Sequence, residues 1–434
     1  MNTRQFNQVS RQLNDALDAI VIDEMGRDAG FCHRERKISP FQLVICMLTS
    51  MACEKTESVA DIRRRIVEWT GEMLSYRAVY SQLSKPEFPI FLAECLSQLL
   101  TVCTEPAQAF VKNSPFARFD RILLQDGSSF ALSDGLSDAF PGRFTGVSPA
   151  AVELHVTMDL LADQPCSISL TADTASERDH LPPVEELNGS LILIDRGYFD
   201  LDWFYQLDVA GGFFICRCLN TVNPVVEQAW SESGRKLKFA EGRKLKEITG
   251  KLLKRKRNEL MVTWKLKGQR KLRVRLIAFW NADEQRYTWL VTNLPRDEFS
   301  LSQVSDAYRL RWQIELMFKE WKSYANLHRF NTGNPHLAEG LIWSSIAAAV
   351  LKRFCCLSAQ RLLNLSLSTR RTAMCCGTTF TRLMICILHG RKRAVTTTLR
   401  ELIEYLGRCA RRSHPERERI NGRAKLGLVP IGIA

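Results

Sequence analysis

The spacing of hydrophobic residues changes twice along this chain, and this change restricts the folds open to it. Residues 1 to about 110 carry apolar side chains at helical spacing. The spacing then becomes that of strands, with short apolar runs at 122–124 and 191–194. Helical spacing returns near residues 302–326 and continues through the C-terminal third. Strands followed by a late helix that can pack back on them predict an α/β layered core between helical regions.

The charge of the chain favours a polyanionic partner. Lys and Arg total 60 against 47 Asp and Glu, which gives a net charge of +13. Nucleic acid and an anionic membrane surface both stay open on this ground. The N-terminus lacks the pattern of a signal peptide, and apolar runs such as 342–351 are shorter than a membrane span. We therefore expect a cytoplasmic protein with no membrane partner.

The cysteines and histidines do not predict a zinc site. The 14 Cys residues include no Cys-x-x-Cys pair, and none of the 7 His residues has the spacing of a zinc finger. Buried, reduced thiols are the better interpretation for a cytoplasmic chain.

The segment SVADIRRRIVEWTGEMLSYRAVYSQLSK contains two short helical patterns that are broken near Thr70 and Gly71. It also carries several arginines, among them Arg63, Arg64 and Arg65. One interpretation is a helix-turn-helix that places its second helix on DNA. The other is a helical bundle with a solvated basic face, and the sequence does not decide between them.

Residues 213–292 differ in character from the strands before them. Between Arg235 and Arg275 the chain has 17 Lys or Arg and 3 acidic residues. Aromatic and β-branched residues are dense in VTWKL, LRVRLIAFW and YTWLVTN, as is typical of strands. We expect a β-rich insertion in the α/β core. Its basic part either contacts a phosphate backbone, for instance through residues 254–257, or serves only solubility.

Two aspartates follow the short apolar runs. Asp126 comes shortly after residues 122–124, and Asp195 comes directly after residues 191–194. Both are therefore expected at the C-terminal ends of buried strands, and in open α/β sheets that edge is where sites form. Taken singly, each aspartate could instead only cap a turn.

The segment DAYRLRWQIELMFKEWKSYANL carries a narrow polar stripe on a helix that is otherwise largely apolar. At about 100° per residue, Tyr308, Arg311, Glu315 and Lys322 fall within roughly 60° of one another. The stripe thus presents a hydroxyl, two cations and one carboxylate. By itself it could also be a solvated stripe in which Arg311 and Glu315 form an ion pair.

Together these segments resemble a known family. Tyr, two residues, Arg, three residues, Glu, six residues and Lys is the signature of the IS-four family of bacterial insertion-sequence transposases, and residues 308–322 match it without a gap. LLQDGSSF around Asp126 and LILIDRGYFD around Asp195 resemble the two aspartate segments of the family, and YTWLVTNLPRDEF resembles its approach to the glutamate. The resemblance covers roughly residues 118–330 and implies an RNase H-like core with a β insertion before Glu315.

This resemblance implies a DDE transposase in which Asp126, Asp195 and Glu315 are catalytic and hold two divalent metal ions, Mg²⁺ or Mn²⁺. Asp126 would bridge both ions, and the other two carboxylates would each complete one site. Water makes the nick, and the freed 3′-hydroxyl then attacks the second strand or the target.

The resemblance also implies DNA-binding residues. Arg311, Lys322 and Tyr308 are expected to hold the backbone of the transposon end. A hairpin intermediate needs a base moved out of the stack, and Trp289 stands at the matching place to receive it. Trp289 could equally be an inward strand residue of the β-rich block.

The predicted function is cut-and-paste transposition of an insertion sequence. Expected partners are double-stranded DNA, both terminal inverted repeats and target, and a second copy of the chain in a synaptic homodimer. Two alternatives remain open: a metal-dependent nuclease without strand transfer, and an inactive transposase-derived DNA-binding protein. Five regions are expected: a helical N-terminal DNA-binding domain at 1–110, the RNase H-like core at 111–212 and 293–345, the β-rich basic insertion at 213–292, and a helical C-terminal region at 346–434.

Overall fold

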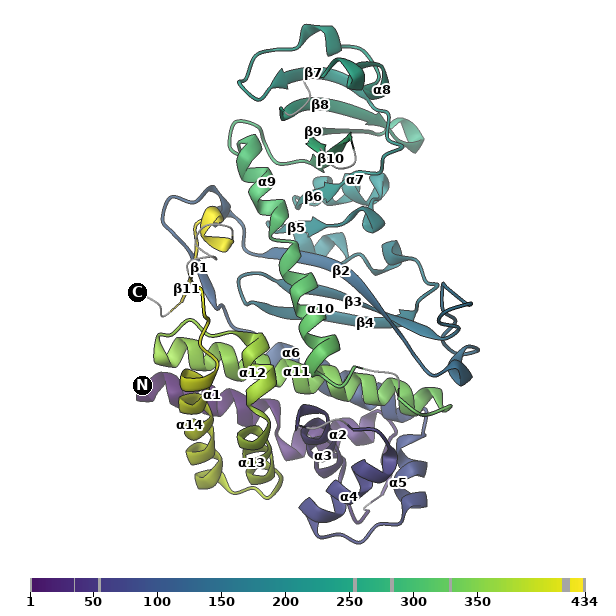
Figure 1. Cartoon of the computed structure of the whole chain (residues 1–434), viewed down its shortest axis with the longest axis vertical. Helices are drawn as coiled ribbons and strands as arrows, with labels where there is room; N and C mark the ends of the chain where they lie inside the picture. Colours follow the sequence, from purple (N-terminus) through teal and green to yellow (C-terminus); the bar gives the residue numbers. More distant parts are fainter. Residues whose placement is uncertain are drawn as a thin grey trace.

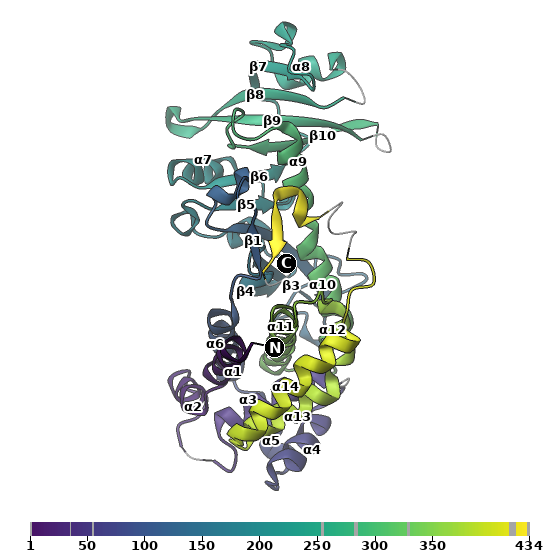
Figure 2. The ribbon, with the colours of Figure 1, turned by 90° about the vertical axis from the view of Figure 1, so that its left-hand side faces the viewer.

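A large sheet and a bundle of helices form the two ends of a long molecule (Figure 1 and Figure 2). The computed structural model describes residues 2–34, 36–53, 56–252, 256–281, 285–327, 330–415 and 422–431. Lys254 and Arg255, which belong to the basic turn considered above, lie outside these residues.

Within the described ranges, nine strands form a single mixed sheet. In spatial order they are β4 (Gln164–Ala172), β3 (Ala151–Asp159), β2 (Ile122–Ala131), β5 (Leu191–Ile194), β6 (Phe213–Arg217), β10 (Arg286–Thr292), β9 (Lys271–Asn281), β8 (Asn258–Lys265) and β7 (Val225–Ser231). β5 pairs in parallel with β2 and β6, and the remaining neighbours in this order are antiparallel. The predicted α/β class is confirmed at this level.

The strands of the basic, β-rich block continue this sheet. The first strand of the block, β6, pairs with β5, and β10, β9, β8 and β7 follow outward, so the block and the central strands share one sheet. Part of its positive charge is structural. Arg275 is buried, and its Nε donates to Glu259 Oε1 at 2.7 Å while its Nη atoms donate to the carbonyls of Leu294 and Phe299. At least this arginine of the basic block is therefore not available to bind a partner.

Helices from both ends of the chain pack into one bundle. α11 packs against α6 and α3, and α13 packs against α3 and α14. Gly71, with φ of 75°, ends α4 where the sequence predicted a break, because a left-handed residue closes the last helical turn. The helices of the bundle are α1 (Thr3–Ala16), α2 (Ala19–Asp28), α3 (Pro40–Cys53), α4 (Val59–Thr70), α5 (Tyr76–Leu83), α6 (Glu87–Cys103), α11 (Pro335–Leu363), α12 (Thr369–Cys375), α13 (Gly377–Leu388) and α14 (Lys392–Cys409).

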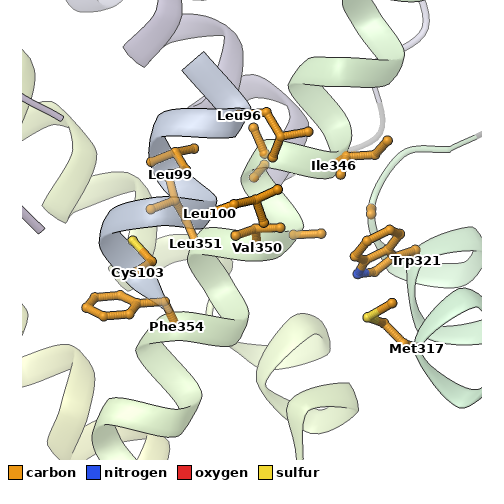
Figure 3. Close-up of a cluster of buried hydrophobic side chains, with 14 of the residues drawn as sticks. Leu96, Leu99, Leu100, Cys103, Met317, Trp321, Ile346, Val350, Leu351 and Phe354 are labelled. Carbon is orange, nitrogen blue, oxygen red and sulfur yellow. The ribbon is translucent and has the colours of Figure 1, made fainter. Parts of the chain in front are cut away.

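The helix α11 is the centre of this bundle. Of the described helices it alone is long and apolar enough to cross a membrane, and 94% of its apolar window is buried inside the protein. Figure 3 shows Val350 and Leu351 of α11 close to Leu99 and Leu100 of α6. The apolar surface of α11 is thus accounted for by packing between helices.

The predicted polar-stripe helix is in fact two helices, α9 (Leu301–Arg309) and α10 (Trp312–Tyr324). Ser300 caps α9 in a capping box with Gln303. The expected single helix was wrong at the junction, where the amides of Leu310 and Arg311 each bond three residues back instead of four. Such bonds tighten the backbone locally. α10 then runs towards the bundle, where Met317 and Trp321 point towards α11 (Figure 1 and Figure 3).

Candidate active site

The two aspartates are neighbours because of the register between β2 and β5. These strands are parallel, and Gln125 pairs with Ile194, so the residues that follow this pair, Asp126 after Gln125 and Asp195 after Ile194, are neighbours. Asp195 follows the end of β5, as the sequence predicted. Asp126 does not end its strand. It lies inside β2, at the point where pairing with β5 stops and pairing with β3 continues, because β2 runs on as one arm of an antiparallel hairpin.

The first turn of α10 brings Glu315 to the same place. Arg311 Nη1 donates to Asp126 Oδ2 at 2.7 Å, and Arg311 Nη2 donates to Glu315 Oε1. The Nε of Arg311 lies 4.0 Å from Asp195 Oδ1. Three carboxylates from three separate elements therefore converge on one guanidinium group.

The electrostatics of the site reflect this crowding. Burial, opposed by Arg311 and assisted by the nearby Asp195 and Glu315, raises the pKa of Asp126 to about 6. Tyr308 Oη donates to Asp195 Oδ1 at 3.0 Å. Burial first, and then the adjacent Asp195, raise the pKa of Tyr308 above its ordinary value, so this hydroxyl stays a proton donor at neutral pH.

The carboxylates suit a hard cation in their donor chemistry, since Mg²⁺ prefers oxygen ligands. In the part of the chain that the structure describes, no three acidic, His or Cys side chains are already arranged to hold a metal ion. Here the positively charged Arg311 lies among the three carboxylates. Its Nε has no hydrogen-bond partner among the described residues, although it is buried. The site therefore fits a cation only if Arg311 gives up its present contacts.

The other two expected DNA-binding residues are placed differently. Lys322 Nζ donates to the carbonyl of Ser129, on the part of β2 beyond Asp126. Trp289 lies on β10 with 7% of its surface exposed, next to Tyr287 at a ring distance of 5.7 Å. No described contact brings Trp289 to the three carboxylates, and Trp289 belongs to a cluster of buried apolar side chains that includes Leu276 of β9 and Val291 of β10.

One exposed aromatic residue beside the site was missed in the sequence. Trp312 directly follows Arg311 and is 49% exposed. Lys319 Nζ lies 4.5 Å from the centre of its ring. Its position within the polar-stripe helix, next to Arg311, was the available signal.

A network of buried polar side chains behind the site was also not predicted. His155 Nδ1 lies 3.3 Å from Tyr198 Oη, and Tyr198 belongs to the 3-10 turn that Asp195 precedes. His155 Nε2 lies 3.0 Å from Thr171 Oγ1, and the ring stacks on His180. Burial and the neighbouring His180 lower the pKa of His155 to about 4. No spacing in the sequence announces such a network, because its members come from β3, β4 and two loops.

Comparisons with known proteins agree on the family. The sequence model of a family described as "Transposase DDE domain" matches residues 117–351. The chain is 24% identical over 381 residues to the transposase for insertion sequence element IS231C of Bacillus thuringiensis subsp. berliner, covering 78% of this chain and 77% of the relative. It is 23% identical over 406 residues to the transposase for IS1151 of Clostridium perfringens, covering 84% and 80%.

A shorter and a structural match complete these comparisons. Over 62 residues the chain is 50% identical to the putative transposase InsL for IS186A of Escherichia coli K12, which covers 14% of this chain and 17% of the relative. A cryo-EM structure of the piggyBac transposase synaptic complex with hairpin DNA aligns with a TM-score of 0.46 and 10% identity, covering 93% of this chain and 85% of the other.

Proposed function

Because this chain belongs to the insertion-sequence transposases with a DDE domain, we propose that it cuts and rejoins DNA through Asp126, Asp195 and Glu315. The observation that carries the proposal is the convergence of these three carboxylates, from β2, the end of β5 and α10, on a single positive group. The proposed fold of residues 111–212 and 293–345 is an RNase H-like core, and residues 213–292 are its β-rich insertion.

Two divalent ions, Mg²⁺ or Mn²⁺, are proposed at this site. Asp126 would contact both, and Asp195 and Glu315 would each hold one. When bound, such ions activate the attacking oxygen and stabilise the leaving oxygen of a phosphodiester. A protein nucleophile is then not needed, so the chain's own task is to bind the DNA and hold the phosphodiester in position beside the three carboxylates.

Arg311 is proposed to exchange its partners when DNA binds. In the free chain its guanidinium donates hydrogen bonds to Asp126 and Glu315, and its planar fork is equally suited to a phosphate. Tyr308 would keep Asp195 oriented through its hydrogen bond. Lys322, on the same helix as Glu315, would add a point charge for the backbone of the transposon end.

The wider proposal is cut-and-paste transposition by a cytoplasmic protein acting on terminal inverted repeats and target DNA. A homodimer would pair two ends. For a hairpin step, a base moved out of the stack needs an aromatic platform. Trp289 is the residue proposed from the sequence, and its burial means that β10 would have to open locally before a base could reach it.

The test is an end-cleavage assay with duplexes made from the DNA that flanks the coding sequence. The wild-type chain with Mn²⁺ should nick these ends and join them to a plasmid, whereas Asp195→Asn should bind the same duplex without cutting it. Nicking without joined products would support a nuclease instead. Binding without nicking by the wild type under every cation condition would support a DNA-binding protein and overturn the proposal.

A further inference from the structure

A polar cavity, separate from the carboxylate site, lies against α10, the helix that carries Glu315. It has a volume of about 470 Å³ and is bounded by α10, α11, the start of α12 and the C-terminal segment. Among the described residues, five basic side chains and two acidic ones line it, a surplus of three positive charges. The basic residues are Lys319, Arg353, Arg370, Arg412 and Arg423, and the acidic ones are Asp163 and Glu320.

Two of the arginines satisfy the two acids. Asp163 Oδ1 accepts from Arg353 Nη2 at 2.7 Å and from Arg423 Nη2 at 2.5 Å. Burial alone raises the pKa of Asp163, but Arg423 and Arg353 outweigh it and hold the pKa at about 2. Glu320 Oε2 accepts from Thr369 Oγ1 at 2.7 Å and lies 3.9 Å from Arg353 Nη1. The surplus charge of the cavity therefore belongs to its other cations.

The cavity also contains a buried donor that is not used. Arg423 is only 6% exposed, and its Nε has no hydrogen-bond partner among the residues that the structure describes. A buried N–H group normally has a partner, because leaving it without one costs free energy. Lys319 and Arg370 are exposed on the same cavity, from α10 and α12. A donor inside and two cations at the surface are what an anionic ligand would contact.

We propose that this cavity binds a backbone phosphate of the DNA whose neighbouring phosphates lie at the carboxylate site. This inference rests on the proposed function and extends it to a second contact on the same helix. Lys319 follows Glu315 by one helical turn, about 5–6 Å along the axis, so a strand held at Glu315 passes within its reach. Trp312 is exposed on the same helix, with Lys319 Nζ 4.5 Å from the centre of its ring, and offers a surface on which a base could stack.

A phosphodiester fits these walls better than other ligands. Arg and Lys side chains are the groups that proteins use for phosphate, and an apolar ligand would leave the charged lining without water. Free inorganic phosphate shares this chemistry. A DNA phosphate and free phosphate can be told apart by salt dependence. Only if the cavity binds a DNA phosphate should removing its cations change how strongly salt weakens duplex binding.

The experiment replaces the two exposed cations, Lys319→Gln with Arg370→Gln, which leaves the buried Asp163 pairs in place. The matched control is Lys392→Gln with Arg393→Gln, which removes the same charge from exposed positions on α14. Binding of a fluorescein-labelled, random-sequence duplex is measured by anisotropy over a series of KCl concentrations. The magnitude of the slope of log K against log salt should be smaller by about 1 in the cavity variant, as expected for one lost phosphate contact, and should stay at the wild-type value in the control. Equal slopes in the two variants would overturn the proposal.

Two further arms separate this inference from the proposed function. Glu315→Gln should abolish Mn²⁺-dependent nicking while keeping the wild-type slope, so loss of cutting and loss of the cavity contact are independent readouts. If wild type cuts DNA but the cavity variant keeps the slope of the control, only the cavity assignment fails. If inorganic phosphate raises the melting temperature of wild type and not of the cavity variant, with slopes unchanged, the ligand is a free anion and the DNA assignment is wrong.

Discussion

Replacing Arg311 with Gln tests whether this guanidinium stands where cations would otherwise bind. Arg311 contacts Asp126 at 2.7 Å and lies 4.0 Å from Asp195. Two unit charges 4 Å apart interact by about 4 kcal/mol at an effective dielectric constant of 20. Removing one partner from a buried ion pair costs about 3–5 kcal/mol. Since solvent still reaches part of this site, we expect Arg311→Gln to lower the free energy of unfolding by about 2–3 kcal/mol at pH 8 in EDTA.

A divalent cation should reverse this loss. Without Arg311, three carboxylates face one another with no positive group between them, and a cation that binds only the folded chain stabilises it. We expect Mn²⁺ to restore the urea midpoint of Arg311→Gln, followed by tryptophan fluorescence. Titration calorimetry without DNA should show Mn²⁺ binding at least about tenfold tighter than in wild type, equivalent to about 1.4 kcal/mol.

The matched control is Arg275→Gln. Arg275 is also buried and lies 2.5 Å from Glu259, but it belongs to β9 and has no contact with the three carboxylates among the described residues. It should be destabilised without any rescue by Mn²⁺. The reasoning about Arg311 would be refuted if Arg311→Gln were as stable as wild type in EDTA, or if it bound Mn²⁺ no more tightly.

Three other predictions follow from the same contacts. Tyr308→Phe should keep the fold but lower end cleavage about 10- to 100-fold in a nicking assay. The reason is that the Asp195 carboxylate no longer accepts the hydrogen bond from Tyr308, and a hydrogen bond to a charged group is worth about 1.5–3 kcal/mol. Unchanged cleavage would show that Tyr308 does not orient Asp195. The pKa of His155 falls from 6.5 to about 4 on folding, so unfolded chains bind more protons between these values and stability should be lost as pH drops from 6.5 towards 4. His155→Gln should flatten that part of a urea-midpoint profile, and a profile as steep as that of wild type would assign the loss to other groups. Trp289→Ala should lower the free energy of unfolding by about 3–5 kcal/mol, because it truncates a core residue. Trp312→Ala should leave the urea midpoint unchanged and weaken single-stranded DNA binding by about 1–3 kcal/mol in anisotropy titrations. The reverse pattern would make Trp289 the stacking surface and Trp312 the core residue.

The sequence predicted the elements of the site better than their connections. Spacing alone placed Tyr308, Arg311, Glu315 and Lys322 on one polar stripe, although the segment is divided between α9 and α10. The apolar runs placed Asp195 correctly after a buried strand, whereas Asp126 lies inside β2 and does not end it. The adjacency of Asp126 and Asp195 depends on the register of β2 with β5, which pairs residues about 70 positions apart. Register of that kind is set by tertiary packing, so no local pattern could supply it.

The β-rich block illustrates a second limit. Its strands were recognised by composition, yet composition cannot say that β6 would pair with β5, so that the block continues the central sheet. The same limit applies to charge. Arg275 and Lys271 are both basic residues of one strand, and at a separation of four residues they lie on the same face of β9. Lys271 begins the strand and is exposed, whereas Arg275 is buried because Glu259 and the carbonyls of Leu294 and Phe299 surround its guanidinium.

The position of Arg311 has a consequence for the order of binding. If its guanidinium leaves the carboxylates for a DNA phosphate, the free chain binds cations weakly and the DNA-bound chain binds them tightly, since the competing positive charge has gone. Linkage requires the reverse effect with the same factor, so cations must tighten DNA binding equally. Two variants separate the two sites: Arg311→Gln and the double variant Lys319→Gln with Arg370→Gln. For each, the affinity for Mn²⁺ is measured with and without a duplex, and the affinity for the duplex with and without Mn²⁺. The ratio of the two affinities is the coupling factor. Only Arg311→Gln should reduce the coupling factor, and a coupling that survives in Arg311→Gln would place the competition elsewhere.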